Sequence, residues 1–156
     1  MTMDTIPSPQ YVLPHDHPMI LIDTIESWHE HGLTASVTVR PDSLFIEPDG
    51  VPAWVGIEYM GQAIAAHAGL CARRDGRPVQ IGFLVGTRRY EPGCSHFPMG
   101  TKLAVFVDAI TSNTTGLQVF ECRITGDGVS VHANLNVFMP ANVAEFLETS
   151  TGSRND

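Results

Sequence analysis

Gly56-Ile-Glu-Tyr-Met-Gly-Gln-Ala-Ile-Ala-Ala-His-Ala-Gly-Leu70 is the stretch that decides the fold of this 156-residue chain. From Ile57 to Cys71 there is no Lys, Arg or Asp, so the stretch predicts a helix that is apolar on nearly every side. Such a helix belongs in the centre of a fold. Its one carboxylate, Glu58, is then expected to be buried, and a buried carboxylate must be paired, protonated or used.

The segments around this helix predict strands. Proline is tolerated in the first turn of a helix, so Pro52 can open it, and Asp75-Gly-Arg-Pro78 ends it after about Arg73. Alternating or β-branched stretches at 19–29, 33–39, 79–90, 102–111, 117–125 and 129–139 predict six strands. The economical cover for one buried helix is a curved antiparallel sheet wrapped around it, which is an α+β fold. A homodimer is expected to cover what the sheet leaves open.

Composition excludes several classes of protein. A net charge of −8 argues against a nucleic-acid surface, which needs clustered Lys and Arg. No apolar run reaches the roughly 18 to 20 residues of a membrane span, and residues 1–10 do not resemble a secretion signal. Three cysteines without a CxxC pair favour reduced thiols in the cytoplasm. The Ser/Thr/Gly-rich tail at 149–156 is expected to be disordered.

Two motifs resemble those of the hotdog-fold β-hydroxyacyl-acyl-carrier-protein dehydratases. Leu13-Pro-His-Asp-His-Pro-Met-Ile-Leu-Ile-Asp23 is similar to their Leu-Pro-His-Arg-x-Pro-x-Leu-Leu-x-Asp opening, and Glu58-Tyr-Met-Gly-Gln-Ala63 is similar to their Glu-Ala-Met-Ala-Gln-Ala helix. Residues 90–103 resemble the strand and Pro-Gly-Asp-x-Leu turn that follow. The helix start also resembles a diverged branch associated with aryl-polyene pigment clusters. The resemblance implies one hotdog domain over residues 1–148.

The resemblance further implies a 3-hydroxyacyl-thioester dehydratase of fatty-acid or polyene-type biosynthesis. Its substrate would be carried on acyl carrier protein or coenzyme A, so the protein itself needs no cofactor. The family carries its catalytic His in a Gly-His-Phe-Pro-Gly loop before the helix. Here the matching loop contains none, because no His occurs between His31 and His67.

Dehydration requires a base for the C2 proton, an acid for the C3 hydroxyl and donors to the thioester oxygen. Glu58 is the candidate acid, and His15, which matches a His of the family motif, is the candidate base, with His17 as a second imidazole. Gln62 would orient Glu58 or hold a partner helix. The backbone amides of Gly56 and Ile57, at the positive end of the helix, would face the thioester oxygen. His15 and His17 without acidic or Cys partners make a weak metal signal, so no metal is expected.

Two other functions compete with dehydration. Hotdog thioesterases also use a carboxylate on the central helix, to activate water, and the missing loop His removes the main feature that separates the two reactions. The chain can also be a non-catalytic hotdog subunit that pairs with an active dehydratase. His67, on the apolar stripe of the helix, is expected to be a core residue.

Overall fold

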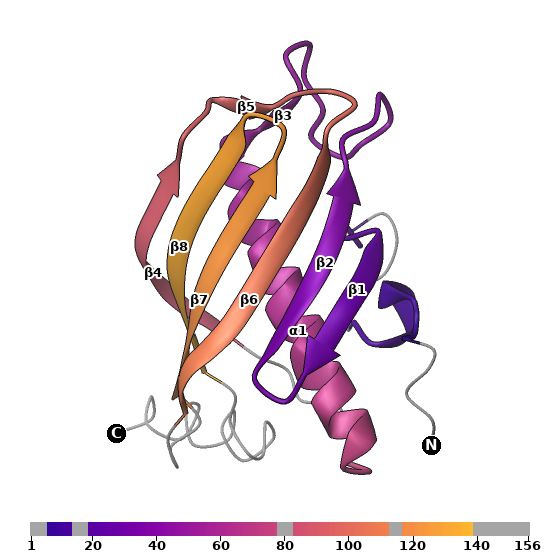
Figure 1. Cartoon of the computed structure of the whole chain (residues 1–156), viewed down its shortest axis with the longest axis vertical. Coiled ribbons are helices and arrows are strands. Elements are labelled where there is room, and N and C mark those ends of the chain that lie inside the picture. Colours follow the sequence, from indigo (N-terminus) through magenta and orange to yellow (C-terminus); the bar gives the residue numbers. More distant parts are fainter. Residues whose placement is uncertain (1–5, 14–18, 78–82, 113–116, 139–156) are drawn as a thin grey trace, which may run out of the picture.

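A six-stranded antiparallel sheet curves over one long helix (Figure 1). The computed structural model describes residues 6–13, 19–77, 83–112 and 117–138. The sheet has the order β1-β2-β6-β7-β8-β4, and a two-stranded sheet, β3-β5, lies near the start of the helix. The described elements are η1 (Pro9–Tyr11), β1 (Thr24–His29), β2 (Gly32–Thr38), β3 (Val51–Pro52), η2 (Ala53–Val55), α1 (Gly56–Arg74), β4 (Phe83–Pro92), β5 (His96–Phe97), β6 (Lys102–Ser112), β7 (Leu117–Gly126) and β8 (Val129–Phe138).

Strand alternation places the core between α1 and the concave face of the sheet. Leu33, Ala35 and Val37 of β2 are buried, as are Val105 and Val107 of β6. On the helix, Met60, Ala63 and Ile64 have almost no exposed surface. The predicted α+β fold, with an antiparallel sheet around a single long helix, is confirmed.

Two of the differences from the sequence predictions lie next to the start of α1 or are made by its side chains. The first strand begins at Thr24 rather than at residue 19, because the backbone of residues 19–22 bonds to a helix side chain instead of to a strand. The segment from Pro52 does not enter the α-helix directly. The 3-10 turn η2 comes first, and its start is pinned by the bond from Ala53 N–H to Ser95 O, 2.9 Å.

The prediction that α1 is apolar and buried on nearly every side is wrong for one face. Glu58 is exposed, and Gly61, Ala65 and Ala68 are only partly covered. These positions follow one another at helical spacing and form a single stripe. The six-stranded sheet lies on the other side of the helix (Figure 1), so this stripe is less covered than the face that packs on the sheet. We call it the open face of α1.

Candidate active site

Glu58 stands on the first turn of α1, at the edge of the open face. Its side chain is exposed and makes no hydrogen bond or ion pair with another described residue. The expected buried carboxylate is therefore a surface carboxylate of the single chain. The physical reason is the position of residue 58 on the helix face that points away from the sheet. A carboxylate without a structural partner is available for chemistry or for contact with a second subunit.

The two backbone amides expected to face a thioester oxygen, those of Gly56 and Ile57, follow a 3-10 turn rather than an open helix start. Gly56 N–H already donates to Ala53 O and Trp54 O, because η2 runs directly into α1. The prediction that the Gly56 amide is a free donor is contradicted by this bonding. Ile57, the other candidate amide, is the next residue of the first turn of α1, and its role as a donor to the thioester oxygen stays a prediction.

Tyr90 ties the start of the helix to the edge strand β4. Its hydroxyl donates to the Ala53 carbonyl oxygen. Gly56 lies directly beneath this hydroxyl, and a Cβ at that position would overlap it. Burial, followed by the nearby Cys94, raises the pKa of Tyr90 to about 12, so the phenol stays protonated as a donor at neutral pH. A side chain at position 56 would displace the Tyr90 hydroxyl from this contact with Ala53.

Tyr59 is a second buried phenol beside the helix start. Its ring packs against Phe97 with centroids 5.9 Å apart. Burial, with a smaller effect of the Asp23 charge, raises the pKa of Tyr59 well above its usual range. It therefore does not supply a base at neutral pH, and the ionisable candidate at this end of α1 remains Glu58.

Gln62 is buried with 2% of its surface exposed, and it holds the chain that precedes β1. Its Oε1 accepts from Leu21 N–H at 2.8 Å and from Ile22 N–H at 3.4 Å, while its Nε2 donates to Met19 O at 2.6 Å. We expected Gln62 to orient Glu58 or to hold a partner helix. Its contacts show a different role, because both ends of the amide are occupied by the backbone of residues 19–22.

Asp23 completes the anchoring of the same segment. Its Oδ2 accepts from Thr38 N–H at 2.6 Å and lies 3.1 Å from Arg40 Nη2. Gln62 and Asp23 therefore hold the backbone around the described part of the opening motif, residues 19–23. His15 and His17 lie outside the described residues. Their proposed roles as base and second imidazole stay predictions.

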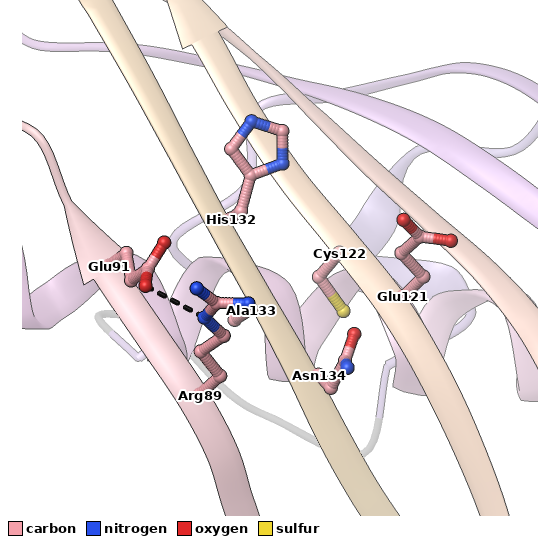
Figure 2. A pocket seen from close by; sticks show the side chains of 7 residues that line it. All are labelled: Arg89, Glu91, Glu121, Cys122, His132, Ala133 and Asn134. Atoms are coloured by element: carbon pink, nitrogen blue, oxygen red, sulfur yellow. Dashed lines mark hydrogen bonds and ion pairs between the residues drawn. The ribbon is translucent and has the colours of Figure 1, made fainter.

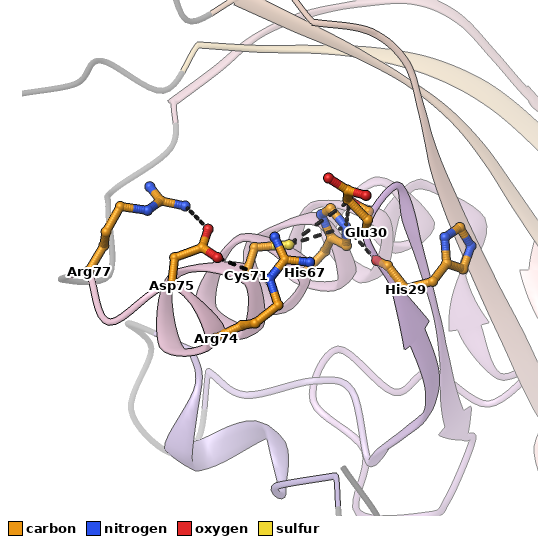
Figure 3. Close-up of polar contacts among 7 residues, drawn as sticks. All are labelled: His29, Glu30, His67, Cys71, Arg74, Asp75 and Arg77. Carbon is orange, nitrogen blue, oxygen red and sulfur yellow. Dashed lines mark hydrogen bonds and ion pairs between the residues drawn. The ribbon is translucent and has the colours of Figure 1, made fainter. Parts of the chain in front are cut away.

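His67 and Cys71 lie toward the opposite end of α1, against the turn between β1 and β2 (Figure 3). His67 Nε2 is 3.1 Å from His29 O and 3.0 Å from Glu30 O, and so donates to one or both carbonyls. Burial lowers the pKa of His67, only partly offset by these backbone bonds, so the ring is neutral at neutral pH. His67 was expected to be a core residue, and it is a buried residue that holds the β1–β2 turn.

The convex face of the sheet has a shallow hollow of its own (Figure 2). Arg89 and Glu91 of β4, Glu121 of β7 and His132 and Asn134 of β8 line it, and Arg89 Nε lies 2.7 Å from Glu91 Oε1. Their strand neighbours Tyr90, Cys122 and Ala133 point to the other face of the sheet, toward the core. The sheet therefore separates this hollow from Glu58. The hollow is lined by both basic and acidic side chains, so its charge favours neither anionic nor cationic ligands.

The three cysteines are free thiols. Burial raises the pKa of Cys122 to about 12, and burial also raises the pKa values of Cys71 and Cys94. A nucleophilic thiolate is therefore disfavoured at each position. Among the described residues, no group of three or more His, Cys, Asp or Glu side chains is placed to hold a metal ion. No helix in the described ranges is long and apolar enough to cross a membrane.

Two exposed aromatic side chains near the start of α1 were not predicted as site residues. Phe45, in the loop before β3, and Trp54, in η2, are exposed, and their ring centroids are 5.4 Å apart. The sequence could have indicated Trp54, because it is an aromatic residue four positions before Glu58. Nothing in the sequence marked Phe45, because its contact with Trp54 depends on the path of the loop.

Comparison with known proteins places the chain near one family. A family model described as ApeP-like, ApeP dehydratase, matches residues 7–148. No curated protein shows significant similarity to the chain. A solved structure described as the dehydratase heterocomplex ApeI:P from Xenorhabdus doucetiae contains a chain with 27% identity and a TM-score of 0.84. That match covers 93% of this chain and 98% of the other.

Thioesterase structures share the fold at lower similarity. A hypothetical thioesterase from Streptococcus pneumoniae TIGR4, solved with coenzyme A, has 12% identity and a TM-score of 0.53, with 74% of this chain and 86% of that chain covered. A mutant thioesterase from Pseudomonas aeruginosa has 19% identity and a TM-score of 0.53, with 75% and 80% covered. At these identities the likeness shows the hotdog fold alone.

Proposed function

The chain belongs to the ApeP-like family of dehydratases, and on that basis we propose that it dehydrates 3-hydroxyacyl thioesters in polyene-type biosynthesis. The acyl group would be carried by acyl carrier protein, and the phosphopantetheine arm would come with the substrate. The observation that carries the proposal is the exposed carboxylate of Glu58 on the first turn of the central helix. It lies in the segment whose motif resembles the catalytic helix of acyl-carrier-protein dehydratases.

The chemistry assigns one proton transfer to each group. A neutral imidazole, for which His15 is the candidate and His17 the second, removes the proton from C2. The electron pair of that C–H bond forms the C2–C3 double bond while the C3–O bond breaks. Glu58, in its carboxylic acid form, gives its proton to the departing hydroxyl, which leaves as water. The Ile57 amide, at the positive end of α1, supports the thioester oxygen as negative charge develops there.

We propose that a second hotdog subunit covers the open face of α1. Gly61, Ala65 and Ala68 have small side chains there, so another chain can approach the helix closely. Glu58 at the edge of this face would then lie at the subunit boundary, where it loses its contact with bulk water. The similar chain in the ApeI:P structure belongs to a heterocomplex, which favours an unlike partner over the homodimer expected from the sequence. The free cysteines agree with a reducing compartment, and we propose the cytoplasm.

The test is dehydration of a 3-hydroxyacyl-acyl-carrier-protein. Mass spectrometry detects the reaction as the loss of one water from the acyl group. The purified chain is assayed alone and after co-expression with the second chain of a dehydratase heterocomplex of the ApeI:P kind. Light scattering gives the composition of each sample. Glu58→Gln is expected to lower kcat by about 10²–10⁴-fold, the usual contribution of a general acid. Glu121→Gln, an exposed acid on the convex face of the sheet, is the matched control and should retain activity.

Three outcomes would change the proposal. Full activity of Glu58→Gln in the assembled protein would remove Glu58 from the mechanism. Release of free acid without any enoyl product would indicate a thioesterase. Activity that needs the second subunit and survives Glu58→Gln would indicate that this chain is a non-catalytic subunit. His15→Gln and His17→Gln, assayed in parallel, identify which imidazole acts as the base.

A further inference from the structure

Phe45 and Trp54 form an exposed aromatic pair at the start of the central helix. Phe45 is 40% exposed and Trp54 is 57% exposed, and their ring planes meet at 60°. The other large exposed hydrophobic side chains that the structure describes, Tyr11, Met19, Met99 and Ile110, show no such ring contact. Two aromatic rings in contact with each other and still open to water make a preformed apolar surface.

The backbone at Phe45 shows that this surface is built rather than incidental. Its φ is +69°, and it is the one non-glycine residue with positive φ among the described residues. Such a backbone conformation is strained for an L-residue, and strain of this kind is retained where the surroundings enforce it, often at functional sites. The strain would be relieved if the backbone at Phe45 adopted a negative φ. Contacts of the neighbouring loop residues must therefore prevent this change.

The loop around Phe45 is held on both sides. Before it, Ser43 Oγ accepts from Arg40 N–H at 2.8 Å, and Ile46 N–H donates to Ser43 O at 3.2 Å. After it, Glu47 exchanges two backbone bonds with Gly50, and its carboxylate is 2.9 Å from His96 Nε2. Gly50 has φ +123° and no room for a Cβ against the Phe97 carbonyl. Phe45 is therefore displayed from a rigid loop.

Trp54 connects this aromatic surface with the proposed acid. It precedes Glu58 by four residues, and η2 continues into α1 without a break in helical conformation at Val55 and Gly56. Trp54 and Glu58 are therefore about one turn apart along this helical path, and both are exposed. The aromatic pair and the carboxylate thus both lie near the start of α1.

We propose that Phe45 and Trp54 are specificity-determining residues that form a wall for the acyl chain, selecting flat conjugated chains over saturated ones. This inference rests on the proposed function, because it places the reacting thioester at Glu58. A flat π system can stack on an aromatic face or meet its edge, and such contacts add to simple burial of apolar area. A flexible saturated chain gains burial only, and it also loses more conformational freedom when it is ordered.

Paired kinetics test the selectivity. The assembled protein is given two 3-hydroxyacyl-acyl-carrier-protein substrates of equal carbon number, one with a conjugated polyene tail and one saturated. Trp54→Leu and Phe45→Leu keep an apolar side chain but remove the ring, and each is expected to lower the ratio of the two kcat/KM values by about three- to tenfold, as the value of an aromatic contact implies. Trp28→Leu is the matched control, because Trp28 lies under Arg74 at the other end of α1 and should leave the ratio unchanged.

A binding measurement separates the wall from an interface role. Trp28→Phe leaves Trp54 as the single tryptophan, and its quenching by acrylamide reports its exposure to solvent. An unreactive thioether of the conjugated acyl chain on pantetheine is expected to reduce this quenching severalfold in the assembled protein, while the saturated thioether reduces it less.

Each other result has one meaning. Equal loss of kcat/KM on both substrates, or an unchanged ratio, overturns the inference while dehydration itself leaves the proposed function standing. If the second subunit alone protects Trp54 from acrylamide and the thioether has no further effect, the aromatic pair belongs to the subunit interface. That result would also overturn the inference. Absence of dehydration by the wild-type assembly would instead count against the proposed function.

Discussion

The contact between Gln62 and the chain before β1 makes a specific prediction about Gln62→Glu. The substitution keeps the size of the side chain and the oxygen that accepts from Leu21 and Ile22. It replaces the donating amide by an oxygen that faces the Met19 carbonyl, 2.6 Å away in the native contact. A carboxylate in this position is buried and repelled, whereas a protonated carboxyl group can still donate to Met19.

The magnitude follows from that single changed contact. At pH 8 the variant loses one hydrogen bond and buries an unpaired charge, so its free energy of unfolding should fall by about 3–5 kcal/mol relative to wild type. At pH 4, below the ordinary glutamic acid pKa of about 4.3, the protonated side chain restores the donor and the loss should shrink to about 1 kcal/mol. The pKa of the variant's side chain is raised on folding, so its stabilising contribution is present at low pH and is lost as the pH rises through the raised pKa.

Urea unfolding at the two pH values measures this difference, with the wild type measured at each pH. Gln10→Glu is the matched control, because Gln10 is exposed and the same change in charge should have little effect there. Amide hydrogen exchange should increase at residues 19–22 in Gln62→Glu at pH 8, ahead of the sheet. A loss of stability that is the same at pH 4 and pH 8, or exchange that is unchanged at 19–22, would refute the assignment of Gln62 as the anchor of this segment.

Two further predictions concern α1. Gly69→Ala places a Cβ 2.5 Å from the Val12 carbonyl oxygen and should destabilise the chain by about 1–3 kcal/mol. A Cβ at Gly61 meets nothing within 4 Å, so Gly61→Ala should stabilise the isolated chain by about 0.5–1 kcal/mol. Urea unfolding measures both variants. Equal urea midpoints would contradict the packing of the chain after η1 on the helix. His67, whose pKa is lowered by burial, is harder to protonate in the folded chain than in the unfolded one. Wild type should therefore lose stability relative to His67→Gln as the pH falls through about 6.5, and parallel pH curves would argue against a buried neutral ring.

Local pattern was sufficient for most of the secondary structure. The helix stretch around Met60 and Ile64 and the alternation of Leu33, Ala35 and Val37 specify their elements by periodicity alone, since each buried face is apolar. The same signal misplaced the start of β1. Ile20 and Ile22 look like strand residues, but the backbone of this segment bonds to Gln62, forty or more residues further along the chain, through Met19, Leu21 and Ile22.

The site was only partly predictable for the same reason. The motif identified Glu58, yet an apolar sequence does not say which face of a helix the sheet will cover, and Glu58 lies on the uncovered one. The free amide expected at Gly56 was lost to the 3-10 turn before it. Phe45 and Trp54 are nine residues apart and meet only because the intervening loop folds back.

The sequence by itself therefore determined the elements, the hotdog fold, the dehydratase family and the identity of the candidate carboxylate, because these depend on periodicity and on short motifs. Only the tertiary structure decided that Glu58 is exposed in the single chain, that Gln62 bonds to the backbone before β1, and that the rings of Phe45 and Trp54 meet. These features depend on contacts between residues distant in the chain, whose partners are chosen by how the sheet and loops close around α1, and no local pattern of side chains encodes that choice.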